Sequence, residues 1–297
     1  MSSTYTAKDI TVLEGLEPVR KRPGMYIGGV GSTGLHHLVW ETLDNSIDEA
    51  MNGHAANIRV TLHEDGSSIT IEDDGRGIPV DVHSKTRKSA LEVIFTLLHA
   101  GGKFEAGNYK TAGGLHGVGA SVVNALSREL VATVRRDGHQ YQMTFMQGKP
   151  AGPLKKVGVA RGTGTTVFFR PDPQIFPKVE FDAAIIRERL EIASYLHRGV
   201  KVTFEDETTG QKDVFQHEEG LVDYLKKIVA DKHSKPVHEA PFTLEKENGV
   251  KIEFVMQWTE ATEENLRSYV NGIPTGSGGT HENGLRAGIG KAVRNYI

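Results

Sequence analysis

Cysteine is absent from the 297 residues of this chain. Its absence excludes disulfide bonds and thiolate metal ligands. The sequence also lacks any run of 18 or more apolar residues, which excludes an ordinary transmembrane helix, and its first residues lack the apolar core of a signal peptide. We therefore expect a cytoplasmic protein with no membrane partner.

An excess of basic charge is also missing. The chain has 35 Lys and Arg residues against 38 Asp and Glu residues, for a net charge of -3. A domain whose whole surface binds nucleic acid is usually basic. Any contact with duplex DNA must therefore be local, or be made by another part of the protein.

Hydrophobic periodicity predicts a chain of mixed helices and strands in two regions. A helical period covers residues 35–51, 89–99, 120–126 and 181–196. Strand-like runs cover residues 57–62, 68–72, 129–135, 140–146, 165–170 and 201–205. The pattern changes near His217, where a helix over 221–229, strands over 251–258 and 267–270, and a helix from Glu282 follow. We expect an N-terminal arm over 1–22, a first domain over 23–217 and part of a second domain over 218–297.

The predicted helix over 35–51 carries one polar stripe. Glu41, Asn45, Asp48 and Asn52 follow one another at spacings of four, three and four, and His37 lies four residues before Glu41. A carboxylate held by an imidazole can activate a water molecule, and a carboxamide oxygen suits the shell of Mg²⁺. The alternative is the solvated face of a surface helix, which is common.

A tight turn follows the predicted strand over 68–72. Residues 72–79 contain three acids, two glycines and a proline. An Asp at this strand end can accept a hydrogen bond from an exocyclic amine such as that of adenine, while glycines let a flat base lie against the backbone. The alternative is an ordinary Asp-Gly hairpin turn.

Residues 100–119 form a glycine-rich segment that leads into a helix and carries Lys103 and Lys110. Backbone N–H groups before a helix, together with lysines, suit phosphate groups. The segment matches neither the Walker A loop nor the dinucleotide G-x-G-x-x-G pattern. A flexible surface loop is the alternative. A shorter Gly-Thr-Gly-Thr turn ends at Thr165, which can support a neighbouring carboxylate.

In this order, the four segments resemble the nucleotide-binding motifs of the ATPase superfamily shared by DNA gyrase, heat-shock chaperone ATPases, sensor histidine kinases and mismatch-repair ATPases. The segments 12–28, 44–50, 98–104, 121–127 and 278–282 resemble bacterial gyrase B and topoisomerase IV B proteins. The resemblance implies an α+β GHKL-type ATPase sandwich, with a mixed, mostly antiparallel sheet and helices on one face. The start of a second α/β domain, the transducer domain, would follow.

The resemblance also implies residue roles. Glu41 would be the catalytic general base and His37 its orienting partner, with Asn45 as the Mg²⁺ ligand and Asp73 as the adenine acceptor. Glu49, one turn after Asn45, is expected to pair with Arg76. The implied ATP-binding set is Tyr5, Asn45, Glu49, Asp73, Arg76, Gly77, Ile78, Lys103, Tyr109, Gly114, Leu115, His116, Gly117, Val118, Gly119 and Thr165. The implied inhibitor contacts are Asp73, Arg76, Pro79, Arg136 and Thr165.

The activity implied is that of an ATP-dependent type II DNA topoisomerase with ATP and Mg²⁺ as cofactors. The subunit would form a homodimer clamp through the arm that carries Tyr5 and Ile10 when ATP is bound. It would join a gyrase A-type subunit in a heterotetramer, pass one DNA duplex through another and accept aminocoumarin-type inhibitors. The family's γ-phosphate lysine lies further along than residue 297, so we expect the isolated chain to hydrolyse ATP poorly.

Three other functions remain open at this point. A topoisomerase IV decatenase subunit shares the same motifs, and residues 268–271, 273–275 and 283–286 favour it, whereas 34–37 and 252–258 favour gyrase B. A sensor kinase would need a phosphoacceptor His domain, and no dimerising helix pair precedes the nucleotide motifs. A chaperone-like clamp that never meets DNA would share the pocket but not the 12–28 segment.

Overall fold

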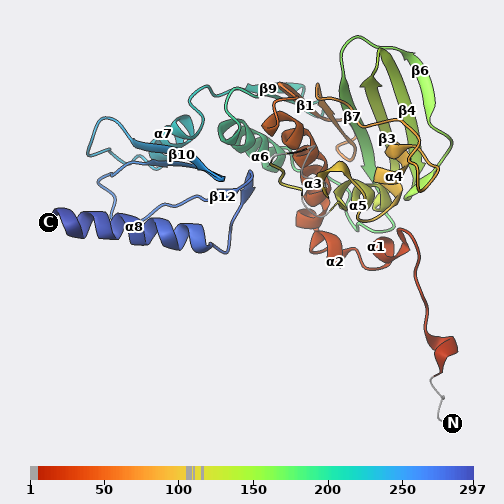
Figure 1. The fold of residues 1–297 in the computed structure, drawn as a ribbon, viewed down its shortest axis with the longest axis horizontal. Coiled ribbons are helices and arrows are strands. Elements are labelled where there is room, and N and C mark those ends of the chain that lie inside the picture. Colours follow the sequence, from red (N-terminus) through yellow and green to blue (C-terminus); the bar gives the residue numbers. More distant parts are fainter. Residues whose placement is uncertain (1–5, 105–108, 110, 115–116) are drawn as a thin grey trace. The chain divides into compact units, whose positions relative to one another are not determined.

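The computed structural model describes residues 6–104, 109, 111–114 and 117–297 (Figure 1). Tyr5, Leu115 and His116 of the predicted ATP site lie outside the described residues. The chain divides into two compact units, residues 1–191 with 199–216 and residues 192–198 with 217–297. No helix of the described ranges is both long and apolar enough to cross a membrane.

The first unit is built on one mixed sheet with the strand order β5-β4-β3-β7-β2-β1-β8-β9, and β6 pairs with β4 outside this path. Strands β1 and β8 are parallel, and the other pairs are antiparallel. The strands are β1 (Asn57–Leu62), β2 (Ile69–Asp73), β3 (Ser127–Arg136), β4 (His139–Met146), β5 (Lys149–Pro150), β6 (Lys155–Val159), β7 (Gly164–Pro171), β8 (Lys201–Asp206) and β9 (Gln211–Phe215).

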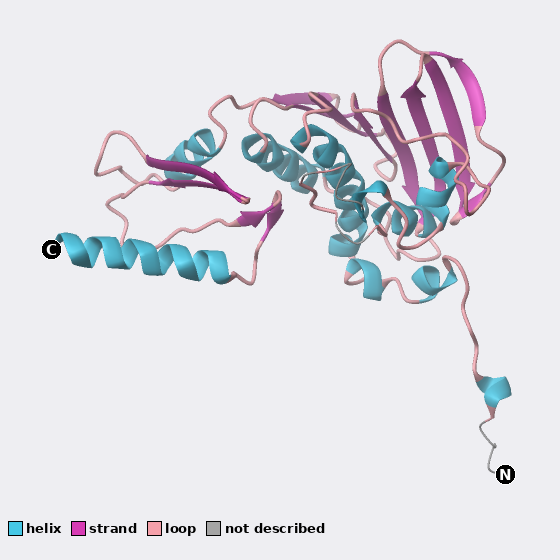
Figure 2. Ribbon diagram, in the orientation of Figure 1, coloured by secondary structure: helices cyan, strands magenta, loops and turns pink. Residues whose placement is uncertain are grey.

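Helices cover one face of this sheet (Figure 2). They are α3 (Ser32–Met51), α4 (Ala90–Thr96), α5 (Gly119–Ala125) and α6 (Ala183–Leu196), with a 3-10 turn η2 (Gly102–Phe104) between α4 and α5. Alternate residues of β3 point into the core between the layers, where Leu130, Ala132 and Val134 are fully buried. On α3 the apolar stripe Val39, Leu43 and Ile47 is buried in the same core. The predicted α+β fold class is confirmed.

The N-terminal segment begins to pack against the first unit before residue 22, the predicted end of the arm. After a 3-10 turn η1 (Ala7–Asp9), it forms the short helices α1 (Glu17–Lys21) and α2 (Gly24–Ile27). Val19 is fully buried, and the Arg20 guanidinium donates to Asp172 Oδ2 and to the Ala125 carbonyl oxygen, each at 2.7 Å. Because these contacts attach α1 to the core, the arm expected over 1–22 is shorter in the structure.

The second unit holds a hairpin and two long helices. They are α7 (Leu221–Asp231), β10 (Phe242–Asn248), β11 (Val250–Met256), the short pair β12 (Tyr269–Val270) and β13 (Ile273–Pro274), and α8 (Thr280–Tyr296). Strands β10 and β11 pair antiparallel around Gly249, and α7 packs against β11. Strand β10 was not predicted because all its residues are exposed, so the sequence shows no alternation between buried and exposed positions there.

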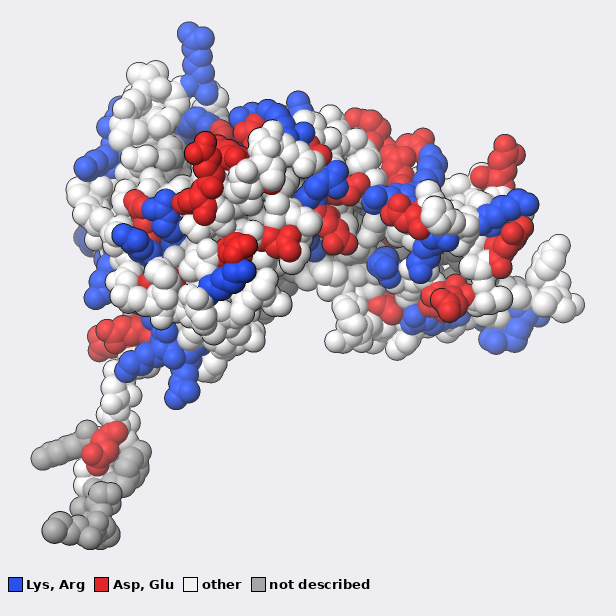
Figure 3. Space-filling model, turned by 180° about the vertical axis from the view of Figure 1, so that it is seen from behind, with Lys and Arg blue, Asp and Glu red and all other residues white. Residues whose placement is uncertain are grey.

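Basic and acidic side chains are interspersed on the face shown in Figure 3. This mixture fits the near balance of 35 basic and 38 acidic residues in the sequence. Among the described residues drawn in this view, neither unit presents a broad surface of one charge sign.

Candidate functional site

Helix α3 presents the predicted polar stripe to the neighbouring loops. The Asn45 carboxamide donates to the Glu41 carbonyl oxygen at 2.8 Å, and the Asn52 carboxamide donates to the Asp48 carbonyl oxygen at 2.7 Å. These bonds to the preceding turn orient both amides, so the Asn45 Oδ1 atom remains available to a partner. The stripe is therefore a set of oriented polar groups, and the solvated-face alternative fails for Asp48, which is 1% exposed.

Glu41 and His37 lie one turn apart, as the spacing predicts. His37 Nδ1 is 3.4 Å from Glu41 Oε1, and both side chains are about one-third exposed. The two groups are not oriented for a hydrogen bond. Among the described residues, the buried His37 Nδ1 atom has no hydrogen-bond partner. The imidazole and the carboxylate therefore lie close to each other on the same face of α3.

Asp73, the last residue of β2, is the buried carboxylate of the site. Its Oδ2 atom accepts from the Ser46 hydroxyl at 2.9 Å, and its Oδ1 atom accepts from Gly75 N at 3.0 Å and Thr165 N at 3.3 Å. Burial raises the pKa of the Asp73 carboxyl to about 6, although these hydrogen bonds act in the opposite direction. Ser46 was missed in the sequence because it lies beside, and not on, the polar stripe.

The turn after β2 is closely packed against β3 and β7. Gly77 has φ of +76°, and a Cβ atom there would lie 2.7 Å from the Arg135 carbonyl oxygen, so only glycine fits. The Arg136 guanidinium donates to the Gly77 carbonyl oxygen at 2.8 Å. Further along the turn, Ile78 is half-buried and Pro79 is exposed.

Arg135 is a neighbour of this turn that the sequence analysis missed. Its guanidinium donates to Glu72 Oε1 at 2.7 Å and to the Asp73 carbonyl oxygen at 3.3 Å. Strand alternation places the adjacent Arg135 and Arg136 side chains on opposite faces of the sheet, and the hydrogen bonds of both reach the end of β2 or the turn after it.

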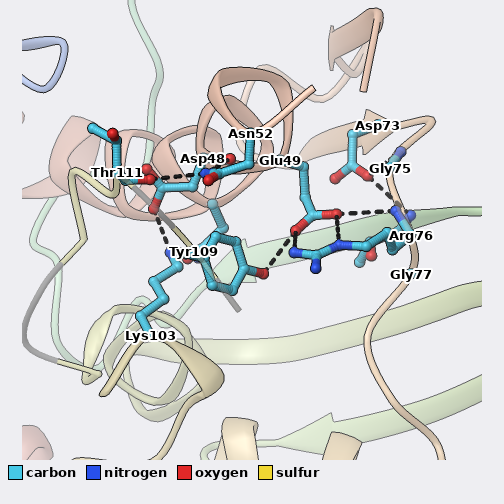
Figure 4. A network of polar contacts seen from close by, with 12 residues as sticks. Asp48, Glu49, Asn52, Asp73, Gly75, Arg76, Gly77, Lys103, Tyr109 and Thr111 are labelled. Atoms are coloured by element: carbon cyan, nitrogen blue, oxygen red, sulfur yellow. Dashed lines mark hydrogen bonds and ion pairs between the residues drawn. The ribbon is translucent and has the colours of Figure 1, made fainter. Parts of the chain in front are cut away.

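Glu49, Arg76 and Tyr109 form the second polar cluster (Figure 4). Glu49 Oε1 accepts from Arg76 Nη2 and from the Tyr109 hydroxyl, each at 2.7 Å, and the Arg76 guanidinium lies 4.8 Å from the Tyr109 ring centroid. Burial alone would raise the pKa of Glu49, but the hydrogen bonds from Arg76 and Tyr109 outweigh it and lower the pKa to about 2. Burial, together with the bond to Glu49, raises the pKa of Tyr109. The expected Glu49–Arg76 pair is present.

Lys103, Asp48 and Asn45 form the third cluster, also visible in part in Figure 4. The Lys103 ammonium is 2.5 Å from Asp48 Oδ2 and donates to Asn45 Oδ1 at 2.7 Å. The Gly113 N–H donates to Asp48 Oδ1 at 2.7 Å, and the Gly114 N–H lies 3.4 Å from Oδ2. The glycine-rich segment therefore lies against the stripe of α3.

The end of that segment begins helix α5. The Gly117 carbonyl oxygen accepts from Ala100 N at 3.1 Å, Val118 precedes the first turn, and Gly119 lies against the Glu41 carboxylate. Within the described ranges no group of three or more His, Cys, Asp or Glu side chains is arranged to hold a metal ion. A metal here would need further oxygen ligands from a bound molecule or water.

Comparison with known proteins places this arrangement in a family. The model of the histidine kinase-, DNA gyrase B-, and HSP90-like ATPases matches residues 31–175, and the model of DNA gyrase B matches residues 220–297. The B subunit of DNA gyrase from Thermotoga maritima is 47% identical over 300 residues, covering 98% of this chain and 47% of that relative. The B subunit of DNA topoisomerase 4 from Mycoplasma pneumoniae is 44% identical over 303 residues, covering 100% of this chain and 47% of that relative.

The chain therefore spans about half the length of the curated relatives it matches. A solved structure agrees with the fold: the 43K ATPase domain of Thermus thermophilus gyrase B, in complex with an aminocoumarin, is 41% identical. It superposes with a TM-score of 0.83 over 95% of this chain and 72% of that chain. The order of the motifs, the sheet and both family models lead to one conclusion: this chain belongs to the DNA gyrase B family of ATPases.

Proposed function

We propose that this chain binds ATP with Mg²⁺ and forms the nucleotide-operated clamp of a type II DNA topoisomerase subunit of the gyrase B kind. The observation that carries the proposal is the buried Asp73 carboxylate at the end of β2, 5% exposed and held by Ser46, Gly75 and Thr165. A buried carboxylate without a cationic partner in its hydrogen-bond set is costly unless a ligand uses it.

Adenine fits the groups around Asp73. The carboxylate retains lone-pair capacity for an exocyclic amine. The close packing of Gly77 against the Arg135 carbonyl oxygen fixes the backbone of the neighbouring turn. The Glu49–Arg76 pair with Tyr109, together with Ile78 and Pro79, would border the base and sugar. Arg136 and Thr165 complete this rim.

The phosphates and the metal fit the other end of α3. Asn45 Oδ1 already accepts from an ammonium group, so a cation is acceptable at this atom. Asn45 would be the chain's Mg²⁺ ligand, and Lys103 with the N–H groups of the glycine-rich segment would face the phosphates. Bound Mg²⁺ would supply charge neutralisation for phosphoryl transfer. Glu41, oriented by His37, would act as the general base toward a water molecule.

The partners follow from the family. We propose that ATP binding dimerises the subunit through the N-terminal arm with Tyr5, and that a gyrase A-type subunit completes a heterotetramer that acts on duplex DNA in the cytoplasm. The Thermus thermophilus relative was crystallised with an aminocoumarin. We propose that such inhibitors bind here at Asp73, Arg76, Pro79, Arg136 and Thr165.

The test begins with calorimetry on the chain. Adenosine and a non-hydrolysable ATP analogue with Mg²⁺ are titrated separately, and saturable binding of both is expected. A full-length subunit carrying this chain is then mixed with its gyrase A-type partner, and phosphate release is measured with and without duplex DNA. Stimulation by DNA is expected, whereas turnover indifferent to DNA would favour a chaperone-like clamp.

A decatenase subunit of the topoisomerase IV kind is the second candidate, because the B subunit of DNA topoisomerase 4 from Mycoplasma pneumoniae is 44% identical to this chain. The same reconstituted enzyme is assayed for negative supercoiling of relaxed plasmid and for decatenation of linked circles. Supercoiling supports the gyrase assignment. Efficient decatenation without supercoiling supports the second candidate.

A further inference from the structure

Asp48 contacts the site through a lysine and was assigned no role above. Its side chain is 1% exposed on α3. The Oδ1 atom accepts from the Gly113 N–H at 2.7 Å, and the Oδ2 atom lies 2.5 Å from the Lys103 ammonium. A buried carboxylate needs such partners, because an unpaired charge is costly away from water. Among the described residues, the Asp48 carboxylate therefore has Lys103 as its cationic partner and the backbone N–H groups of Gly113 and Gly114 as further donors.

The Lys103 ammonium is also hydrogen-bonded to Asn45 Oδ1, the atom proposed to bind the metal. Lys103 donates to Asn45 Oδ1 at 2.7 Å, and the Asn45 amide nitrogen is held by the Glu41 carbonyl oxygen at 2.8 Å. A Mg²⁺ ion binds an oxygen at about 2.0–2.1 Å in a strict octahedral shell. An ammonium hydrogen-bonded to that oxygen would repel the ion and block its shell, so the two cations exclude each other at Asn45.

We infer that Asp48 is a positioning residue that holds Lys103 at the site as an exchangeable resident cation. The Lys103 ammonium bridges Asp48 and Asn45 in the structure. When a metal–nucleotide takes Asn45, Lys103 leaves that oxygen but stays beside Asp48, next to the phosphates. The inference rests on the proposed function for the identity of the ligand.

Backbone contacts around Asp48 support the assignment. The Asn52 carboxamide links the Asp48 carbonyl oxygen to the Thr111 carbonyl oxygen, at 2.7 and 2.8 Å, so α3 and the glycine-rich segment are joined beside the carboxylate (Figure 4). Asn52 therefore ties the backbone that carries Asp48 to the glycine-rich segment, whose Gly113 N–H donates to the carboxylate. Lys103, on a flexible four-carbon stem, is the member of the cluster that can move.

The first test is a double-mutant cycle on the affinity of the chain for a non-hydrolysable ATP analogue with Mg²⁺. The variants are Asp48→Asn, Lys103→Met and the double variant, with Lys88→Met as the matched lysine control because Lys88 pairs with Glu92 elsewhere, at 2.8 Å. Each single change at the cluster should weaken binding about tenfold or more, as expected for a charge-assisted contact. The double variant should bind no more than about twofold weaker than Lys103→Met, because Asp48 acts through Lys103.

Adenosine affinity is measured in parallel and should be unchanged in every variant, which also shows that each one is folded. Additive losses in the double variant, or an unchanged affinity in Asp48→Asn, would overturn the inference. Failure of the unmodified chain to bind both adenosine and the analogue would instead overturn the proposed function.

The second test observes the ammonium itself. In chain labelled with ¹⁵N-lysine, we expect a water-protected Lys103 ammonium signal by NMR without any nucleotide, identified by its loss in Lys103→Met. Asp48→Asn should abolish it, and the Mg²⁺ analogue should shift it while it remains protected. A signal that survives Asp48→Asn would contradict the proposal that Asp48 holds Lys103. A signal that the analogue leaves unshifted would contradict the proposal that Lys103 leaves Asn45 when the metal–nucleotide binds.

Discussion

Glu41 lies directly against the backbone of Gly119. A Cβ atom added at Gly119 would be 2.2 Å from Glu41 Oε2 and 3.2 Å from its carboxyl carbon. The glycine at the start of α5 therefore leaves the space in which the proposed general base sits. The requirement is steric and independent of any need for a left-handed backbone conformation.

Gly119→Ala should displace the Glu41 carboxylate and lower ATP turnover in a full-length subunit. A misplaced general base loses most of its roughly 10²–10⁴-fold contribution to the rate. Gly101→Ala is the control in the same segment, since a Cβ atom there meets no atom of the described residues within 4 Å. Equal turnover in the two variants would refute this role of Gly119.

Glu41→Ala should reduce turnover while leaving nucleotide affinity nearly intact. A general base acts on water and not on the bound nucleotide, so the loss should appear in kcat, by roughly 10²–10⁴-fold. Steady-state phosphate release and calorimetry on the same full-length subunit separate the two effects. A collapse of affinity would instead mean that Glu41 holds the ligand or the fold.

Asp73→Asn should weaken adenosine binding to the chain. Replacing a charged acceptor in a buried site costs roughly 1.5–3 kcal/mol, or more than tenfold in affinity. Calorimetry with adenosine isolates this effect from the phosphate contacts. An affinity equal to that of the unmodified chain would remove Asp73 from the adenine site.

The pKa of Asp73, raised by burial to about 6, makes the same binding depend on pH. Because the ligand needs the ionised carboxylate, affinity should be constant above about pH 6 and fall by up to about tenfold per unit below it. The sign for stability is opposite: a folded pKa above the ordinary 3.8 means that Asp73 destabilises the unliganded fold as pH rises from 3.8 to about 6. Titrations from pH 5 to 8 should show the step in the unmodified chain and not in Asp73→Asn.

Gly34→Ala should destabilise the first unit. A Cβ atom at Gly34 in α3 would be 1.9 Å from the Gly29 carbonyl oxygen, so the backbone before the helix must shift, at a cost of about 1–3 kcal/mol. In the part of the chain that the structure describes, a Cβ atom at Gly288 in α8 meets no atom within 4 Å, so Gly288→Ala should leave stability unchanged or slightly higher. Thermal denaturation of the two variants provides the comparison, and an unaltered midpoint for Gly34→Ala would contradict the steric argument.

Short and exposed strands were the part of the fold that periodicity did not predict. Strand β6 is exposed along its length, and β9 is largely so, which leaves no alternation between a buried and a solvated face. They exist because β4 and β8 offer them backbone hydrogen-bonding partners. Such pairing depends on a neighbouring strand as well as on the residues of the strand itself, so the local hydrophobic pattern does not predict it.

By itself, the sequence determined the helices with a buried stripe, the alternating central strands and the order of the polar motifs, because each depends on residues within a few positions of one another. The spacing of four between His37 and Glu41 is of this kind. The tertiary structure alone decided that Ser46 reaches Asp73, that Arg135 pairs with Glu72 and that Lys103 bridges Asp48 and Asn45. The hydrogen bonds from Ser46, Arg135 and Lys103 join residues that are 27, 63 and 58 positions apart. The packing of α3 against the sheet and the glycine-rich segment brings Ser46 and Lys103 to their partners, and the strand order β3-β7-β2 brings Arg135 to Glu72.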